Sequence, residues 1–400
     1  MKILLLVCST SRSEATSYMQ AVQRAGARVA CVASPELIPD GVDVPLPAHH
    51  LSVEEALGAI EEWGGQCDGV LGVGLQGGVV AAHLATILGL DGHTPGGVSL
   101  TANKARLLRR LSAADLPLPD FQLISPEEMN VKGVEQWNYP QVLQPTIRKG
   151  LNPKIRVNDS EGALRLLTGN VTLSLLAPTE NCVLREQCPP ESETLVLTGL
   201  THQGHFYPLA FLDRRGIIEG RPGKETVYLA PSRQQSSVLE HGCRLAASAC
   251  STIGLDDGPV QATLRRVGED LVLLDVAGHP LAVPIARSLR FGKGNMTLEE
   301  VHVRHALRME VDLVVREEVG ATLFGHSIAQ GAFGGLAGVE AAKSSMEVLD
   351  AGTELSAGSV LIPVEDGGHA PFWVSGRGGN HQALEDGLAR AAEKIRIRVL

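Results

Sequence analysis

Two apolar segments within residues 258–280 bring together side chains that can bind ions. The tight Val-Gly-Glu-Asp stretch between these segments predicts a turn, and the whole pattern predicts a β-hairpin. Thr263 and Asp275 lie twelve residues apart on it (275 − 263), and Ala277 and His279 follow two and four residues later. Carboxylate and hydroxyl oxygens are hard donors, and an imidazole can be neutral or cationic. The hairpin therefore carries residue types suited to charged ligands.

The first 97 residues alternate short apolar runs with helical patterns. This alternation predicts a parallel sheet covered by helices on both sides, which is an α/β domain. The expected strands are 2–7, 28–32 and 69–73, and the expected helices are 13–25, 52–63 and 79–88.

The rest of the chain predicts an α+β arrangement in which successive strands are antiparallel. The turn Thr-His-Gln-Gly at 201–204 joins two of these strands. The expected strands are 141–144, 155–157, 182–186, 193–200 and 205–213, and the expected helices are 159–167, 234–253 and 382–394.

Composition limits the classes of function. The 400 residues are 44% apolar and 20% charged, with a formal net charge of −10. That charge disfavours general binding to nucleic acid or an anionic membrane, and no apolar run is long enough to span a bilayer. Seven Cys without a Cys-x-x-Cys pair predict reduced thiols and a cytoplasmic protein.

The helix that begins at Asn103-Lys104 and ends before Pro117, together with the order of elements, resembles the ATP-grasp superfamily. Its carboxylate–amine ligase and biotin-carboxylase-like members are the most similar. The resemblance implies a pre-ATP-grasp parallel domain at 1–97 and a linker helix with a small lid at 98–187. It further implies a central α+β half at 188–307 and a C-terminal extension at 308–400.

The resemblance assigns roles to the hairpin. Family members hold the magnesium ions of ATP with two Glu residues twelve apart, then an Asn and an Arg. This chain has Thr263, Asp275, Ala277 and His279 at those places. Asp275 and Thr263 become the metal candidates, while His279 and Lys104, the latter matching a phosphate-binding lysine, become the catalytic candidates.

The resemblance also implies a nucleotide site. Glu186 and the linker backbone at Cys188 match the groups that bind adenine, and Glu193 matches the ribose-binding Glu seven residues on (193 − 186). Gln144 replaces the family lysine on the phosphate strand, and Lys149 in the following loop can supply charge instead. The alternative is that both Glu residues are ordinary strand ends and that the loop is a solvated basic turn.

The expected activity is ATP-dependent amide formation between a small carboxylate and an amine, weakened by the altered magnesium and phosphate positions. The alternative is an inactive relative that binds a nucleotide or metabolite, or that supports a partner ligase. A homodimer is a further expectation from the family.

Two other motifs permit different interpretations. Residues 72–77 read Gly-Val-Gly-Leu-Gln-Gly, which is either a dinucleotide fingerprint or a tight turn packed on the sheet. The i, i+3 pairs His202/His205 and His302/His305 suit either zinc or ordinary exposed or capping roles, and neither pair has a third ligand nearby in sequence.

Overall fold

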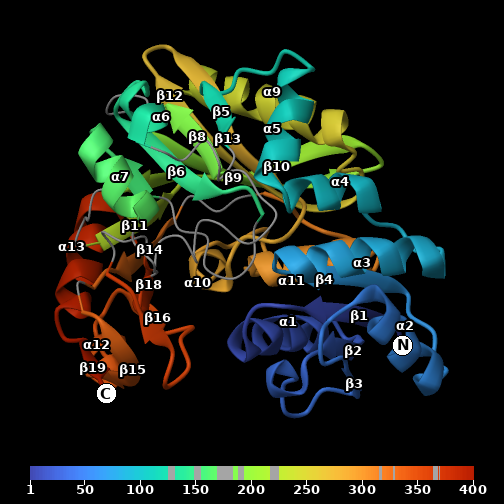
Figure 1. Ribbon diagram of the computed structural model, residues 1–400. Helices are drawn as coiled ribbons and strands as arrows, with labels where there is room; N and C mark the ends of the chain where they lie inside the picture. The colour runs from blue at the N-terminus through green and yellow to red at the C-terminus, as the bar shows by residue number, and fades with distance from the viewer. Residues whose placement is uncertain are drawn as a thin grey trace.

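The computed structural model describes residues 1–124, 131–147, 155–168, 183–187, 193–216, 225–314, 318–327, 329–363, 368 and 370–400. Three regions follow one another from blue to red in Figure 1. A parallel sheet with helices comes first, a small antiparallel sheet second, and a large antiparallel sheet with the C-terminal elements last. The predicted order, α/β and then α+β, is confirmed.

The first region is a four-stranded parallel sheet in the order β3-β2-β1-β4. Along β1, Leu4 and Leu6 pack into one apolar cluster while Leu5 and Val7 pack into another. Both faces are therefore covered, which explains why β1 is an uninterrupted apolar run. The elements are β1 (Ile3–Cys8), α1 (Arg12–Arg24), β2 (Arg28–Ala33), η1 (Pro35–Leu37), β3 (Val44–Pro47), α2 (Val53–Trp63), β4 (Gly69–Val73) and α3 (Leu75–Leu88).

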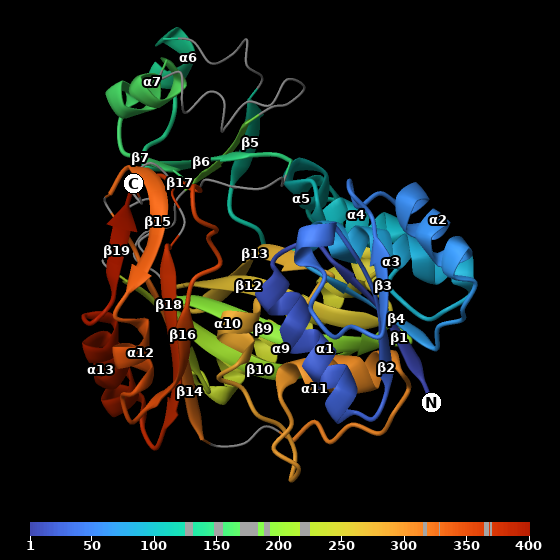
Figure 2. The same ribbon diagram turned by 90° about the horizontal axis from the view of Figure 1, so that it is seen from below.

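The second region holds two linker helices and the lid, a four-stranded antiparallel sheet in the order β5-β8-β6-β7. The lid lies at the top of Figure 2, where α6 and α7 lie beyond its strands. The elements are α4 (Pro95–Thr101), α5 (Lys104–Ser112), β5 (Phe121–Ile124), α6 (Val131–Glu135), β6 (Gln141–Pro145), β7 (Ile155–Val157), α7 (Ser160–Thr168) and β8 (Val183–Gln187).

The third region is built on an eight-stranded antiparallel sheet in the order β13-β12-β9-β10-β11-β14-β18-β16. Strands from both sides of the expected boundary between residues 307 and 308 belong to this sheet, because β11 pairs with β14. Its strands are β9 (Thr194–His202), β10 (His205–Arg215), β11 (Glu225–Ala230), β12 (Gly258–Val267), β13 (Asp270–Ala277), β14 (Val319–Gly325), β16 (Val348–Gly352) and β18 (Phe372–Gly378).

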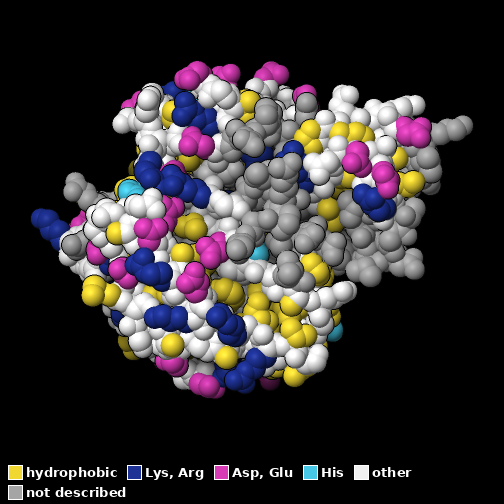
Figure 3. All heavy atoms as spheres, turned by 90° about the vertical axis from the view of Figure 1, so that its left-hand side faces the viewer, with side chains coloured by type: hydrophobic (Ala, Val, Ile, Leu, Met, Phe, Trp, Pro, Cys, Tyr) yellow, Lys and Arg dark blue, Asp and Glu magenta, His cyan; other side chains and the backbone are white. Residues whose placement is uncertain are grey.

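Helices and a small sheet complete this region. The β17-β15-β19 sheet lies with α12 and α13 on the left of Figure 1, and both acidic and basic side chains occur across that face in Figure 3. The remaining elements are α9 (Ser236–Ile253), α10 (Val283–Ala286), α11 (Leu298–Ala306), β15 (Gly331–Ala337), α12 (Val339–Lys343), β17 (Val360–Leu361), α13 (His381–Ala392) and β19 (Arg396–Val399).

Among the helices of the described residues, none combines the length and apolar character needed to cross a bilayer. The five described cysteines are free thiols, and burial raises the pKa of Cys31 and Cys250 to about 12.

The contact between β4 and α11 has no room for a side chain on Gly69. A Cβ atom placed there would overlap the carbonyl group of Ala306 at the end of α11. Gly69→Ala is expected to lower the free energy of unfolding by about 1–3 kcal/mol, because the helix must shift to relieve the overlap. Gly58→Ala is the matched control. Gly58 lies in α2 facing open space, so its replacement should raise stability by about 0.5–1 kcal/mol. Urea unfolding midpoints measure both, and equal midpoints for the two variants would contradict the packing argument.

A buried histidine links stability to pH. His302 on α11 is fully buried against Tyr18 of α1, and Tyr18 Oη lies 3.0 Å from its Nδ1. Burial lowers the pKa of His302 to about 3, and that of buried His93 to about 4. Both values lie below the ordinary histidine pKa of about 6.5. At a pH between the folded values and about 6.5, the unfolded chain therefore binds more protons than the folded chain does. The two histidines therefore cost no free energy of unfolding above about pH 6.5. The free energy of unfolding decreases as the pH falls from there toward their pKa values in the folded protein.

The expected loss below pH 6.5 approaches about 1.4 kcal/mol per pH unit for each of the two histidines. His302→Gln should roughly halve this slope, because Gln stays neutral and can still accept the Tyr18 hydrogen bond. Exposed His50→Gln is the control and should leave the slope unchanged. Unfolding free energies between pH 7.5 and 5 test this, and an unaltered slope in His302→Gln would contradict it.

Candidate functional site

A cavity of about 290 Å³ lies between the first sheet and the large sheet. Thr10, which follows β1, and Gly74, which follows β4, line it from one side. The chain leaves β1 toward β2 on one side, while β4 pairs on the other side of β1. The cavity therefore lies at the point where the strand order reverses, the usual ligand position in open parallel sheets.

The predicted hairpin is present as β12 and β13, and it lines the opposite side of the cavity. Thr263 pairs with Asp275 and Gln261 pairs with Ala277, and a bulge follows Thr263. Thr263, Asp275 and His279 all line the cavity. The structure thus brings these three predicted residues to one cavity, and their metal and catalytic roles remain predictions. Ala277 is buried and offers no ligand atom.

Lys104 connects the hairpin to the lid. Its side chain is almost fully buried, and its ammonium donates to the carbonyl of Leu274 and lies 3.8 Å from Oδ1 of Asp275. Its backbone N–H donates to the carbonyl of Thr146, just after β6, at 2.7 Å. Asn103 caps the helix by accepting from Arg106 N–H. The structure therefore places the predicted phosphate-binding lysine beside the predicted metal ligand.

His279 forms hydrogen bonds beside the cavity. Its Nδ1 lies 2.9 Å from the carbonyl of Pro280, so Nδ1–H donates. Its Nε2 lies 3.4 Å from the amide nitrogen of Gln261. In this arrangement Nε2 accepts from the Gln261 amide, next to the hairpin residues.

Two further residues with ionisable side chains, which the sequence analysis did not identify, line the cavity. Glu14 of α1 accepts from Val283 N–H at 2.8 Å, and burial raises its pKa. Arg214 of β10 lies over the ring of Tyr228, with its guanidinium carbon 5.6 Å from the centroid. No local pattern marks either residue, because Glu14 reads as first-turn acid of a helix and Arg214 as a strand end.

The predicted adenosine and phosphate residues are distributed over the lid and its junction with the large sheet. Gln144 is buried in β6, opposite Leu184 of β8. Glu186 lies in β8, where its backbone pairs with β5 and β6, and its side chain lies outside what the structure describes. Lys149 and Cys188 also lie outside the described residues.

Glu193 immediately precedes β9 and is largely exposed. Its carboxylate accepts from Gln234 Nε2 at 2.7 Å and lies 3.8 Å from Arg266 Nη1. Its carbonyl accepts from Arg266 N–H of β12 at 2.9 Å. Because β12 pairs directly with β9, the segment that begins at Glu193 and the β12–β13 hairpin belong to one sheet.

The glycine motif at 72–77 packs a strand against a helix. A Cβ on Gly72 would lie 2.5 Å from the carbonyl oxygen of Gly77. Ser9 Oγ accepts from Gly77 N–H at 2.9 Å. The tight-turn interpretation accounts for these contacts.

Comparisons of the sequence with protein-family models and with curated proteins find no match. Comparisons of the structure with solved structures find matches. L-amino acid ligase from Bacillus licheniformis is 17% identical with a TM-score of 0.77, covering 100% of this chain and 99% of that one. N5-carboxyaminoimidazole ribonucleotide synthetase from Thermotoga maritima is 10% identical with a TM-score of 0.73 and full coverage of both chains.

The biotin carboxylase domain of Hydrogenobacter thermophilus 2-oxoglutarate carboxylase, solved with MgADP, is 14% identical with a TM-score of 0.69. It covers 99% of this chain and 90% of that one. These neighbours are ATP-grasp proteins, and they match over essentially the whole chain. The parallel domain, the lid and the large sheet together therefore make this chain an ATP-grasp fold.

Proposed function

We propose that this protein is an ATP-dependent carboxylate–amine ligase acting on small molecules such as amino acids. The observation that carries the proposal is the approach of Lys104 to Asp275, 3.8 Å apart, beside a cavity at the sheet switch point. A buried ammonium next to a partly exposed carboxylate can serve both a phosphate chain and a metal ion. The ligase neighbours support this class of reaction.

In this proposal Glu186, Glu193 and the backbone at Cys188 bind adenosine, while Lys104, Gln144 and Lys149 contact phosphates. Asp275 and Thr263 hold magnesium, and their pairing on adjacent strands makes them a fitting but minimal donor set. Magnesium, when bound, neutralises charge on the triphosphate.

The reaction has two steps. A substrate carboxylate oxygen takes the γ-phosphoryl group of ATP, which gives an acyl phosphate and ADP. An amine nitrogen then attacks the carbonyl carbon, an amide bond forms, phosphate leaves and the nitrogen loses a proton. Glu14 and Arg214 give the cavity one acidic and one basic side chain, which suits the ammonium and carboxylate of an amino acid. His279 can orient Gln261 by accepting one of its amide hydrogens at Nε2, and the other amide hydrogen of Gln261 can donate to a substrate oxygen in the cavity.

The alternative function is a non-catalytic ATP-grasp protein that binds a nucleotide or metabolite, or that supports a partner ligase. Buried Ala277 on the hairpin and neutral Gln144 on the phosphate strand favour it, since each replaces a charged or polar group of the family. A cytoplasmic location and a homodimer accompany either version as proposals.

A nucleotide titration separates the versions. The ligase should gain thermal stability with ATP and more with ATP and magnesium, because a ligand that binds only the folded state stabilises it by RT ln(1 + [L]/Kd). It should also release ADP with at least one pair from an amino acid mixture. Stabilisation by ATP without any magnesium effect or ADP release would support the non-catalytic version. No stabilisation by ATP or ADP would eliminate both nucleotide-binding versions and leave the role in support of a partner ligase.

A further inference from the structure

Two histidines from separate sequence pairs meet at one carboxylate. His202 ends β9, Asp257 precedes β12, and His305 lies in the last turn of α11. His305 Nε2 lies 2.9 Å from Oδ1 of Asp257, and His202 Nδ1 lies 3.1 Å from Oδ2. One ligand atom from each residue lies within 4.8 Å of the other two. Ligand atoms about 2.0–2.2 Å from a tetrahedral zinc ion are spaced similarly.

The backbone around Asp257 is held in place by the neighbouring turn. Gln203 and Gly204 join β9 to β10, and both have positive φ, 49° and 78°, as a type I′ turn requires. Gly204 N–H donates to the carbonyl of Asp256 at 2.8 Å, and Gln203 N–H lies 3.4 Å from Asp257 Oδ2. The three side chains therefore converge from the end of β9, the bend before β12 and the last turn of α11.

Arg308 now neutralises this carboxylate. Its guanidinium lies 2.8 Å from Asp257 Oδ1, 3.0 Å from Asp91 Oδ2 and 3.3 Å from His202 Nδ1. Burial opposes ionisation of Asp257, but hydrogen bonds from His305 and Arg308 hold its pKa well below the ordinary range. Arg308 is about one-third exposed and has a φ of +53°, so it sits on a turn at the surface.

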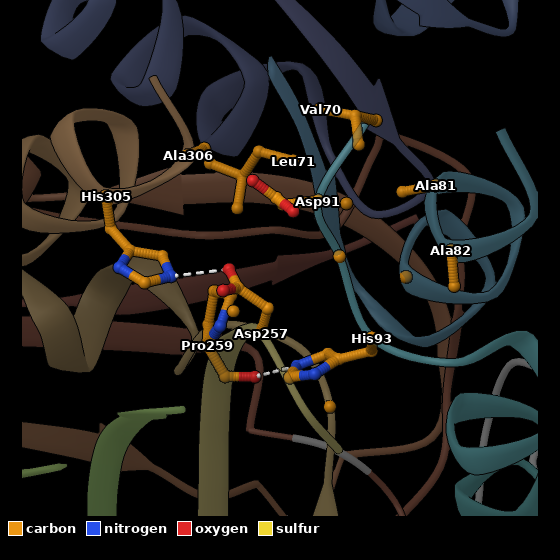
Figure 4. Close-up of a pocket in the computed structure, with 15 residues that line it drawn as sticks. Val70, Leu71, Ala81, Ala82, Asp91, His93, Asp257, Pro259, His305 and Ala306 are labelled. Atoms are coloured by element: carbon orange, nitrogen blue, oxygen red, sulfur yellow. Dashed lines mark hydrogen bonds and ion pairs between the residues drawn. The ribbon is translucent and has the colours of Figure 1, made fainter. Parts of the chain in front are cut away.

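A second cavity of about 40 Å³ adjoins this cluster at the base of the β12–β13 hairpin. Figure 4 shows His305, Asp257, Asp91 and His93 around it. His93 is buried, its Nε2 lies 2.9 Å from the Pro259 carbonyl, and its Nδ1 has no partner among the described residues. The space is large enough for a water molecule, which a three-ligand metal site needs at its fourth position.

We propose that His202, Asp257 and His305 bind a divalent metal ion of the zinc type. Two imidazoles and a carboxylate are a donor set that zinc and cobalt accept. Each ring would bind through the nitrogen that faces the carboxylate, with its proton on the other nitrogen. Arg308 is the competing cation, and it must turn away when the ion enters. The bound ion would link the base of the hairpin to α11. This metal-site proposal does not depend on the proposed nucleotide site.

The test is metal binding by the whole dialysed protein. Zn²⁺ affinity is measured by competition with a chromogenic chelator, and ligand type is measured from the Co²⁺ absorption spectrum. The wild-type protein should bind one equivalent, and His305→Gln should bind at least about tenfold more weakly. Arg308→Gln should bind at least about tenfold more tightly, with a normal melting temperature and no thiolate band in its Co²⁺ spectrum, which separates this gain from zinc binding by cysteines that misfolding would expose. His205→Gln is the matched control, because His205 lies across the same turn and its exposed ring is hydrogen-bonded to the Gln203 carbonyl rather than to Asp257.

Three outcomes would overturn the proposal. The first is no binding by either the wild-type protein or Arg308→Gln. The second is equal affinity in the wild-type protein and in a His305→Gln variant that melts normally. The third is a thiolate charge-transfer band in the Co²⁺ spectrum, which would place the ion on cysteines.

Discussion

Asp275→Asn is expected to lower ATP-dependent ligation by about 10²–10³-fold, the usual cost of removing one group that stabilises charge in the transition state. Asp275 is the only charged oxygen donor at the four hairpin positions, since Thr263 and Ala277 are neutral and His279 has no oxygen donor. The amide keeps the size of the side chain but loses the charge that faces Lys104 and that is proposed to bind magnesium. The measurement is the rate of ADP release with the amine and carboxylate pair found in the titration.

Asp270→Asn is the matched control for that variant. Asp270 begins the same strand, β13, but is exposed at the turn, five residues from Asp275 (275 − 270). Its replacement should leave the rate unchanged within about twofold, because a solvated charge at that distance is strongly screened. Melting temperatures of both variants separate a loss of function from a loss of fold. Equal rates for Asp275→Asn and Asp270→Asn would remove Asp275 from the mechanism.

The double variant Thr263→Glu with Gln144→Lys is expected to tighten magnesium–ATP binding by about tenfold or more. The first change adds a second carboxylate directly opposite Asp275, and the second adds a positive charge to the phosphate strand. Hard carboxylate ligands increase magnesium affinity, and an ammonium forms charge-assisted hydrogen bonds with phosphate. Isothermal titration with ATP, with and without magnesium, measures the effect.

The sign of the magnesium dependence makes this prediction specific. Without magnesium, Glu at 263 should weaken ATP binding, because two carboxylates would then face the triphosphate. Thr263→Gln is the control for the first change, since it adds the same length without charge, and Gln144→Met is the control for the second. An affinity in the double variant equal to that of the wild-type protein would mean that these residues do not line the phosphate site.

Local sequence patterns were sufficient to predict many of the helices and strands. Period-2 and period-3.6 hydrophobicity with Gly turns identified the parallel domain, the β12–β13 hairpin and the α5 helix to within a few residues. The twelve-residue spacing of Thr263 and Asp275 became a direct cross-strand pair because the short turn pairs Val267 with Asp270 and a bulge after Thr263 then shifts the register by one residue.

Some elements escaped the pattern for identifiable reasons. Strand β3 contains Pro45 and Pro47, which disfavour a strand in sequence, yet it lies at the edge of its sheet, where Pro is tolerated. Strand β5 has only four residues, too few to show a period. Both needed a partner strand to define them.

The sequence by itself determined which segments are strands and helices around the hairpin, and which family positions have changed type. Only the tertiary structure decided which side chains meet. Lys104 reaches Asp275 from 171 residues away (275 − 104), Glu14 enters the same cavity from the first helix, and His202 and His305 share one carboxylate. The reason is physical: hydrophobic periodicity records which face of each element is buried, whereas the approach of two distant polar groups depends on how those buried faces pack together.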